Sequence, residues 1–381
     1  MKRFVFTYLC LSIVMLAGCG KQGGRTLTSA TGSIYECLVV VPNSPLTASQ
    51  LEQVSKAQLQ PNDGSSYVED ITTLYDAVRA VMSADMPCMP QKEAYFKLMQ
   101  VTPALFDNLL KPTRNILWVD IDSSRYTQVK VKPQREVWST PQAVYRIQTP
   151  SADEFLTYWL EHGTLIRDWF INQEMTRQLR FYRAATDKDI RARLNNQFAC
   201  DMLVPNDYML LMDTTLEATS TFGLTANTQV LWACNNKGSL RRDLVVYSYP
   251  YTDENTFTLP YLNAKRDEVL APLISAGVEG TYMGTEYKVF PPQMRVLTVD
   301  STYTAEVRGL WKMRGGEAMG GPYVSHTWLD PVHARVVTAE VFVFAPGQKK
   351  RNPLRQAEAI LYSREHYYEK NEDSDIIRQY G

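Results

Sequence analysis

The sequence lacks most of the short motifs by which enzymes and metal proteins are recognised. Only four histidines and six cysteines occur among its 381 residues. No Gly-x-Ser-x-Gly, His-Glu-x-x-His, Walker A or Cys-x-x-Cys motif is present, and these are signatures of serine hydrolases, zinc peptidases, P-loop nucleotide hydrolases and thiol oxidoreductases. We therefore expect no cofactor and no metal site, and the sequence argues against an enzyme.

An excess of charge of either sign is also missing. Lys and Arg together number 40, and Asp and Glu number 41. Because a dedicated nucleic-acid-binding protein shows a basic excess, we expect no nucleic-acid partner. Hydrophobic residues make up 45% of the chain and charged residues 21%, which is typical of a folded globular protein. After residue 18, no apolar run approaches the length of a membrane-spanning helix.

The N-terminus carries the clearest signal in the sequence. A basic MKR start is followed by an apolar run over residues 4–16 and by LAGC at residues 16–19. This combination is typical of a bacterial lipoprotein signal peptide, and the apolar run is too short for a permanent membrane span. We predict cleavage after Gly18, acylation of Cys19 and a mature chain anchored to a membrane by lipid. An uncleaved anchor with a chance cysteine is the alternative.

Cys10 lies in the predicted signal peptide and Cys19 is the predicted lipid site. The other four cysteines are Cys37, Cys88, Cys200 and Cys234. In an oxidising envelope they permit two disulfides with three possible connectivities. The interpretation we favour is four buried thiols that pack as small hydrophobic residues. A chain of this length does not depend on cross-links to secure a core.

The remaining pattern predicts an α+β fold. Apolar runs at 35–41, 115–121 and 336–344 indicate buried strands, and 129–131 with 143–147 indicates a strand pair. We expect Ser151 to cap a helix that ends near residue 162, a second helix over about 165–195, and a last helix capped by Asn352. Because strands follow one another in series, we predict two similar-sized halves, each a mainly antiparallel sheet with flanking helices. The predicted divisions are a signal peptide at 1–18, a flexible tether at 19–34, an N-terminal half at 35–198, a C-terminal half at 199–368 and a polar tail at 369–381.

The densest group of distinctive residues lies between 308 and 323. Residues 315–322 contain four glycines, which permit positive φ and close approach of the backbone to a ligand. Arg308 could bind a carboxylate or phosphate, and Trp311 and Tyr323 could stack on a sugar or peptide. With Gly320 and Gly321 these residues form our candidate binding surface. The alternative is a hairpin whose aromatic residues are sheet core and whose Arg308 forms a structural ion pair.

Three carboxylates near this stretch could serve in acid/base catalysis: Glu286, Glu317 and Asp330. Two carboxyl groups roughly 5–10 Å apart in a cleft would favour a glycan hydrolase. His326 and His333 lie in the same region, but a metal site would need a third ligand. We expect these histidines to be ordinary strand and turn residues.

Several short stretches resemble one known family. They are RNIL at 114–117, RD at 266–267, YMGTE at 282–286, RGLW at 308–311, MGGPYVS at 319–325 and KRN at 350–352. With the LAGC motif they resemble the Bacteroidetes lipoprotein family called domain of unknown function 4837, over about Tyr35 to Tyr367. The resemblance brings no known activity or catalytic residue. It implies a Gram-negative outer-membrane lipoprotein, and the absence of acidic residues directly after Cys19 implies the periplasmic face.

The predicted function is accordingly a lipid-anchored cell-envelope protein that binds or scaffolds a protein or glycan partner in the periplasm without catalysis. The alternative is a carboxylate-dependent hydrolase acting on envelope glycan or peptide.

Overall fold

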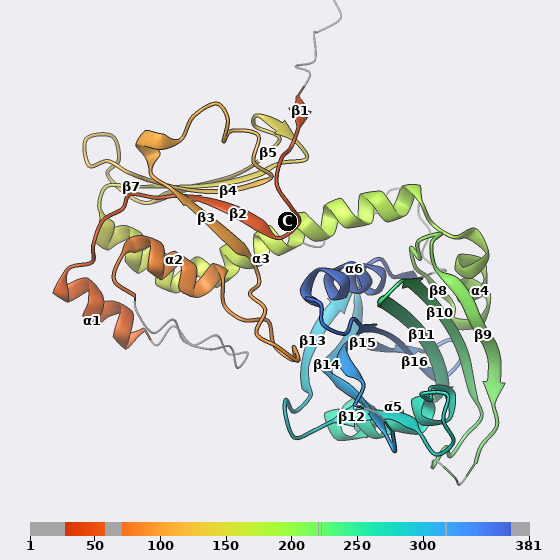
Figure 1. Ribbon diagram of the computed structural model, residues 1–381. Helices are drawn as coiled ribbons and strands as arrows, with labels where there is room; N and C mark the ends of the chain where they lie inside the picture. The colour runs from red at the N-terminus through yellow and green to blue at the C-terminus, as the bar shows by residue number, and fades with distance from the viewer. Residues whose placement is uncertain (1–26, 58–70, 220, 222, 317, 367–381) are drawn as a thin grey trace, which may run out of the picture.

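The computed structural model describes residues 27–57, 71–219, 221, 223–316 and 318–366. The predicted signal peptide, Cys19, Glu317 and the predicted tail lie outside these residues. Two β-sheets of different construction are joined by one long helix (Figure 1), which confirms the predicted α+β class. Among the described residues, no helix combines the length and the apolarity needed to cross a membrane.

The N-terminal sheet has five strands in the order β3-β2-β4-β7-β5. They are β2 (Glu36–Val40), β3 (Lys97–Val101), β4 (Asn115–Ile121), β5 (Lys130–Arg135) and β7 (Ala143–Thr149). Strands β3, β2, β4 and β7 run parallel, and only β5 is antiparallel, as the predicted partner of β7. The sheet is therefore mixed, whereas a mainly antiparallel sheet was expected. Long crossovers between these strands, instead of hairpins, return the chain to the same end of the sheet.

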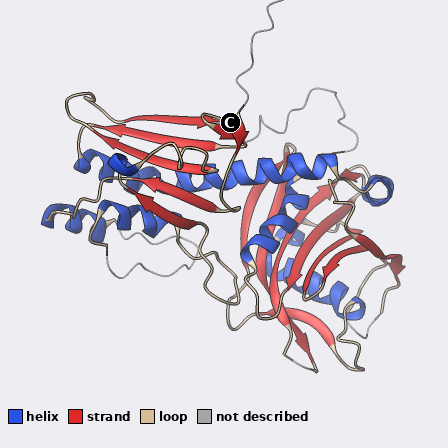
Figure 2. Cartoon of the chain, turned by 45° about the horizontal axis from the view of Figure 1, so that its top comes forward, coloured by secondary structure: helices blue, strands red, loops and turns tan. Residues whose placement is uncertain are grey.

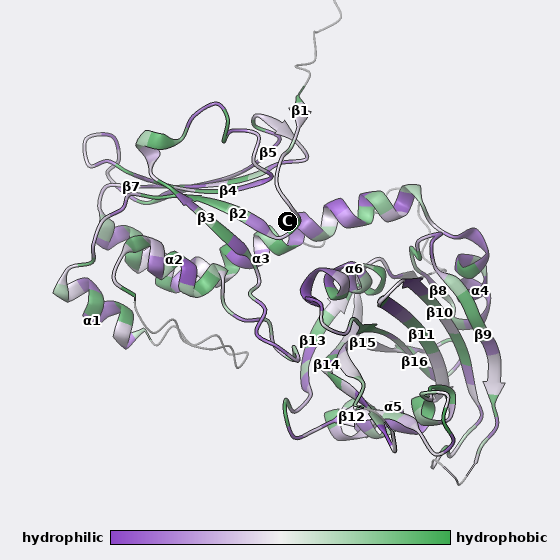
Figure 3. Ribbon diagram, viewed as in Figure 1, coloured by the Kyte–Doolittle hydropathy of each residue, from purple (hydrophilic) through white to green (hydrophobic). Residues whose placement is uncertain are grey.

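Three helices cover one face of this sheet (Figures 1 and 2). They are α1 (Ala48–Lys56), α2 (Leu74–Met82) and α3 (Ala152–Ala184). Helix α3 is continuous over 33 residues, where two helices with a break near Gly163 were expected. A Cβ at Gly163 would lie 3.0 Å from the Trp159 ring, so glycine here permits packing and does not end the helix. Bands of polar and apolar residues alternate along α3 (Figure 3), as in a helix with one buried side.

The C-terminal sheet has eight strands that are all antiparallel and curve around a core (Figure 1). They are β9 (Met209–Leu216), β10 (Thr228–Lys237), β11 (Leu240–Pro250), β12 (Tyr282–Glu286), β13 (Gln293–Val299), β14 (Thr302–Arg314), β15 (Gly320–Asp330) and β16 (Arg335–Phe344). The long strand β14 pairs with β15 on one side and with β13 and β12 in turn on the other. Helix α5 (Leu259–Leu273) packs on one face of the sheet, and α6 (Arg351–Tyr362) packs on the other. Helix α4 (Lys188–Phe198) follows α3 and ends where the C-terminal half was predicted to begin.

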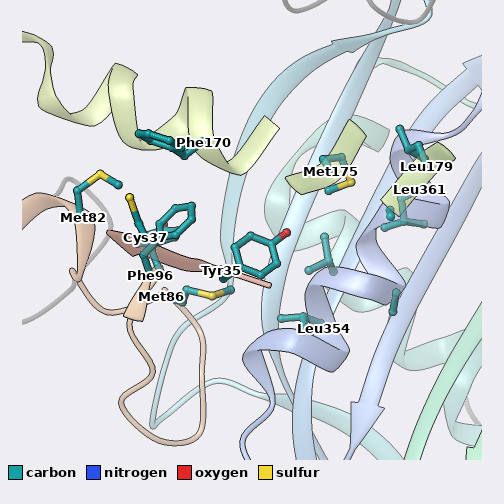
Figure 4. Packing of buried hydrophobic residues seen from close by; sticks show 14 of the residues in the cluster. Tyr35, Cys37, Met82, Met86, Phe96, Phe170, Met175, Leu179, Leu354 and Leu361 are labelled. Carbon is teal, nitrogen blue, oxygen red and sulfur yellow. The ribbon is translucent and has the colours of Figure 1, made fainter. Parts of the chain in front are cut away.

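One hydrophobic core runs through both halves (Figure 4). It joins Phe96, which precedes β3, to Phe170 and Leu179 on α3 and to Leu354 and Leu361 on α6. Continuity of the core follows from the length of α3, whose first turns cover the N-terminal sheet and whose last turns reach α6. The Tyr182 hydroxyl of α3 donates a hydrogen bond of 2.8 Å to the carbonyl of Gln356 on α6.

The described chain begins on the N-terminal half. Strand β1 (Thr28–Ser29) pairs in parallel with β6 (Ser139–Thr140), and the Thr31 amide donates to the Pro112 carbonyl at 2.9 Å. The predicted tether is therefore shorter than expected, because the chain is held against the N-terminal half from Thr28 onward. Two further short strands, β8 (Cys200–Asp201) and β17 (Glu365–His366), pair near the other end of the described chain, and the short 3-10 helices are η1 (Pro103–Leu105) and η2 (Glu254–Phe257).

Candidate functional site

The aromatic residues of the candidate binding surface lie inside the C-terminal half. Trp311 is 3% exposed and Tyr323 is 1% exposed, both in the core beneath α5. The Trp311 indole donates to the Val343 carbonyl at 3.2 Å, and the Tyr323 hydroxyl donates to Asn263 of α5 at 3.3 Å. These side chains are not exposed for stacking on a ligand, so the structure corrects the expectation of a recognition surface here.

The paired glycines serve the same packing. Gly320 and Gly321 lie in β15, and neither has positive φ. A Cβ at Gly321 would lie well under 3.0 Å from the Val343 carbonyl oxygen, and one at Gly320 would lie 2.7 Å from the Trp311 carbonyl oxygen. Glycine is required because another backbone comes close; the contact is made by the protein itself and not by a ligand.

A buried ion pair stabilises this layer. Arg266 of α5 forms two hydrogen bonds with Glu340 of β16, at 2.8 and 2.7 Å. Its guanidinium carbon lies 3.9 Å from the centroid of the Tyr323 ring. Of the residues that carried the family resemblance, Arg266, Trp311 and Gly321 are thus packing and ion-pair residues.

Arg308 is the centre of a buried polar cluster on the opposite face of the sheet. Its guanidinium donates to Glu306 at 2.8 Å and forms an ion pair with Glu358 of α6. Glu306 is fully buried and also accepts hydrogen bonds from Arg295 at 2.6 Å and from the Tyr362 hydroxyl at 2.7 Å. We name the whole set the α6 clamp, and it comprises Arg295, Glu306, Arg308, His326, Arg355, Glu358 and Tyr362.

The α6 clamp extends into the N-terminal half through Arg355. This side chain donates to Glu358 at 3.1 Å, and its guanidinium carbon lies 5.9 Å from the ring centroid of Tyr35 and 5.5 Å from that of Tyr95. Tyr35 lies directly before β2 and Tyr95 shortly before β3. Figure 4 shows Tyr35 between Phe96 and the α6 residue Leu354. Cation–π contacts act within about 6 Å of a ring centroid, so Arg355 reaches both tyrosines and links the two halves.

A second tie is an unusual helix cap. Asn352 was expected to cap the last helix, but α6 begins after Lys350, which makes no side-chain capping bond. Instead the carboxylate of Glu93, from the N-terminal half, accepts hydrogen bonds from the backbone amides of Lys350 at 2.7 Å and Arg351 at 2.8 Å. A carboxylate at a helix N-terminus satisfies free amides and complements the helix dipole. The N-terminal half thereby supplies the cap of a helix in the C-terminal half.

The three carboxylates proposed for catalysis do not form a pair among the described residues. Glu286 ends β12, where it forms an ion pair with Lys312 and accepts a 2.7 Å hydrogen bond from the Lys288 amide. Asp330 ends β15 and is bound by Arg335 at 2.9 Å. The register places these two carboxylates about 26 Å apart along the strands, which is too far for a shared acid/base mechanism. Glu317 lies outside the described residues.

The two histidines lie in different places. His326 is buried in the α6 clamp, and its Nε2 lies 3.2 Å from Glu306. His333 is in the turn after β15 and its Nδ1 lies 2.7 Å from Asp330. Within the part of the chain that the structure describes, no group of three His, Cys, Asp or Glu residues could hold a metal ion. Cys37, Cys88, Cys200 and Cys234 are all buried and free, which agrees with the favoured interpretation.

The charged groups of the α6 clamp shift one another's pKa values. Burial alone would raise the pKa of Glu306, but the ion pair with Arg308, the hydrogen bond from His326 and the charge of Arg295 hold it well below its usual value. Burial lowers the pKa of His326, and nearby Arg364 and Arg308 add to this, whereas Glu306 opposes it. The buried Nδ1 of His326 has no hydrogen-bond partner within the described part of the chain. Above its pKa, His326 is therefore a neutral donor to the ionised carboxylate of Glu306.

This arrangement predicts a pH dependence of stability that His326 causes. Because the folded-state pKa of His326 lies below its ordinary value near 6.5, the unfolded chain binds the proton first as pH falls. Stability is then complete above pH 6.5 and decreases below it, by at most about 1.4 kcal/mol per pH unit. We expect His326→Gln, which can still donate to Glu306, to flatten the curve of unfolding free energy between pH 7 and 5. Denaturant titrations at several pH values measure this, and parallel curves for the two proteins would contradict it.

Sequence reasoning identified Arg308 but missed its partners. Glu306 and Arg308 are two residues apart on a strand and so share one face, and Arg355, Glu358 and Tyr362 share one face of a helix. These spacings indicate one polar face on strand β14 and one on helix α6, although both elements contain many apolar residues. They do not indicate that the two faces meet.

Comparison with known families divides the chain at the turn between α3 and α4. Residues 187–363 match Domain of unknown function (DUF4837), and residues 68–183 match Domain of unknown function (DUF8532). The resemblance expected over nearly the whole mature chain is thus found for the C-terminal part, and the N-terminal part matches a different family. No curated protein matches the chain. Neither family description names an activity.

Proposed function

We propose that this protein is a lipid-anchored envelope protein that binds or scaffolds other envelope components without catalysis, in the periplasm at the outer membrane. The observation that carries the proposal is that the side chains best suited to chemistry, above all Arg308 and Glu306, are engaged in holding α6 on the C-terminal sheet. Because these groups are buried and paired, the surface that meets a partner lies elsewhere on the molecule.

The N-terminal residues support the lipid anchor. The LAGC motif ends at Cys19, and the described chain is held against the N-terminal half from Thr28 onward. The eight residue steps from Cys19 to Leu27 span at most about 29 Å, so an acylated Cys19 would keep the N-terminal half near its membrane. The match of residues 187–363 to a family of unknown function agrees with the resemblance from which the Bacteroidetes outer-membrane assignment comes.

Labelling and fractionation of cells test the anchor. Cells expressing the full chain are fed an alkyne fatty acid, and the inner and outer membranes are separated. We expect labelled protein in the outer-membrane fraction and no label on the matched variant Cys19→Ala. Unlabelled wild-type protein in the soluble fraction would overturn the anchor, and protease access in intact cells would overturn the periplasmic orientation.

Crosslinking in the native envelope tests the binding role. Wild-type protein is crosslinked in cells, purified and analysed by mass spectrometry, with Cys19→Ala as the control for membrane placement. A small, reproducible set of envelope proteins or bound glycan, recovered unmodified, supports binding or scaffolding. Conversion of purified glycan strands or peptides to smaller products by the protein would favour the hydrolase alternative.

A further inference from the structure

An apolar segment lies exposed on the face of the N-terminal sheet that the helices leave uncovered, which we name the outer face. Here Leu38, Val40, Ile116 and Val144 form a small buried cluster. The segment 102–111 crosses this cluster, and Phe106 and Leu110 pack down onto it. Leu105 and Leu109 do not, and they are 68% and 84% exposed. The segment therefore has one side on the protein and two leucines turned to solvent.

The same face carries positive charge that the described protein does not neutralise. Lys132 of β5 lies directly opposite Arg146 of β7, and like charges in such a pair are unfavourable. The Arg146 guanidinium carbon lies 4.4 Å from the centroid of the Trp118 ring, which in turn lies 4.6 Å from that of Phe106. No described carboxylate forms an ion pair with Arg146, Lys132 or Lys130, the next outer-face position of β5. The cations thus adjoin the apolar segment, and Asp120, a carboxylate on the same face, forms its ion pair with Arg125 and not with them.

The chain enters the fold beside this segment. The Thr31 amide bonds to the carbonyl of Pro112, the residue after the segment, and β1 pairs with β6 next to it. In Figure 1 the segment between β3 and β4 and the start of the described chain lie on the same upper side of the molecule, and the C-terminal half lies below. A tether of at most about 29 Å from Cys19 would keep this side near the membrane.

We propose that the outer face docks on the anionic phospholipid bilayer to which the N-terminal lipid is anchored. Leu105 and Leu109 enter the headgroup region, and Lys130, Lys132 and Arg146 bind lipid phosphates. A surface contact of this kind adds to a lipid anchor both through buried apolar area and through attraction to anionic lipid. It fixes the orientation of the molecule and leaves the C-terminal half free for a partner. The proposal rests on the proposed function for the identity of the membrane.

Vesicle binding of the unlipidated mature chain tests the docking directly. The protein carries Cys19→Ser and is floated with vesicles of phosphatidylethanolamine and phosphatidylglycerol, or of phosphatidylcholine alone. We expect binding to the anionic vesicles that weakens about tenfold or more in Leu105→Asn/Leu109→Asn. Lys130→Gln/Lys132→Gln should lose about tenfold or more on anionic vesicles only, and the wild type should weaken in high salt. The matched control is Leu165→Asn on α3, since Leu165 is 65% exposed but lies on a helix behind the sheet.

Two results would overturn the docking. One is equal vesicle binding by wild type, both double variants and the control. The other is retention on peptidoglycan sacculi without binding to vesicles, which would assign the face to glycan. The flotation assay needs no acylation, so the two proposals can fail separately. Absence of fatty-acid label on Cys19 would overturn only the lipid anchor, and absence of flotation would overturn only the docking.

Discussion

Replacing Arg308 with alanine is expected to lower the free energy of unfolding by about 3–5 kcal/mol. The change removes the cation that lies between two buried carboxylates, Glu306 and Glu358. The two carboxylates would repel each other in a site that water does not reach, although Arg295 and Arg355 would still hold one each. Denaturant unfolding followed by circular dichroism measures the loss.

Arg125→Ala is the matched control for this experiment. Arg125 also contacts two carboxylates, Asp120 and Asp122, but its side chain is largely in solvent. Ion pairs that water reaches contribute little to stability, so this variant should be nearly as stable as the wild type. If Arg308→Ala were no less stable than Arg125→Ala, the α6 clamp would not be a structural tie. Because Arg308→Ala should destabilise the protein strongly, this variant is unsuitable for mapping a binding surface. If it failed to bind a partner, unfolding and not a lost contact would be the cause.

Gly321→Ala is expected to destabilise the protein by about 3 kcal/mol, at the upper end of the cost of overpacking. The new methyl group would overlap the Val343 carbonyl oxygen and approach the Trp311 indole nitrogen. Since Val343 lies in the adjoining strand β16, only a shift of the backbone could relieve the overlap. That shift would also break the hydrogen bond from the Trp311 indole to Val343.

Gly238→Ala supplies the comparison for Gly321. Gly238 has a φ of +63° in a turn, and a Cβ there would meet no atom within 4 Å. We expect a cost of about 1 kcal/mol from backbone strain alone. Thermal unfolding of both variants distinguishes close packing from backbone conformation. Equal losses would show that the contact with Val343 does not limit residue 321.

The class of fold could be predicted from the sequence, but the direction of its strands could not. Strand runs such as residues 35–41 and 115–121 were recognised because they are continuously apolar, and such runs are typical of strands buried on both faces. Continuously apolar strands are also typical of a parallel sheet. The predicted pairing of 129–131 with 143–147 nevertheless led us to expect antiparallel strands in the whole N-terminal half. Gly163 suggested a break in α3 because glycine has a low helix propensity. In the structure it instead makes room for the ring of Trp159, four residues earlier on the same helix.

The site was predictable only within single elements. Trp311 and Tyr323 attracted attention as possible stacking residues, but their alternating positions on strands are equally those of a sheet core, and burial decided between the two. The cap that Glu93 provides for α6 joins residues more than 250 positions apart, and no local pattern marks such a contact. The exposure of Leu105 and Leu109 was not predicted, because exposure is a property of the folded surface.

Hydrogen exchange followed by mass spectrometry most directly tests the central claim, that the α6 clamp and the shared core make one cooperative unit of the two halves. The most protected amides of β4 in the N-terminal half and of β15 in the C-terminal half are compared under native conditions in wild type and Arg308→Ala. The account predicts equal free energies of opening for the two strands in the wild type and a similar decrease in both in the variant. Unequal free energies in the wild type, with Arg308→Ala affecting only β15, would show that the halves fold independently and would contradict it.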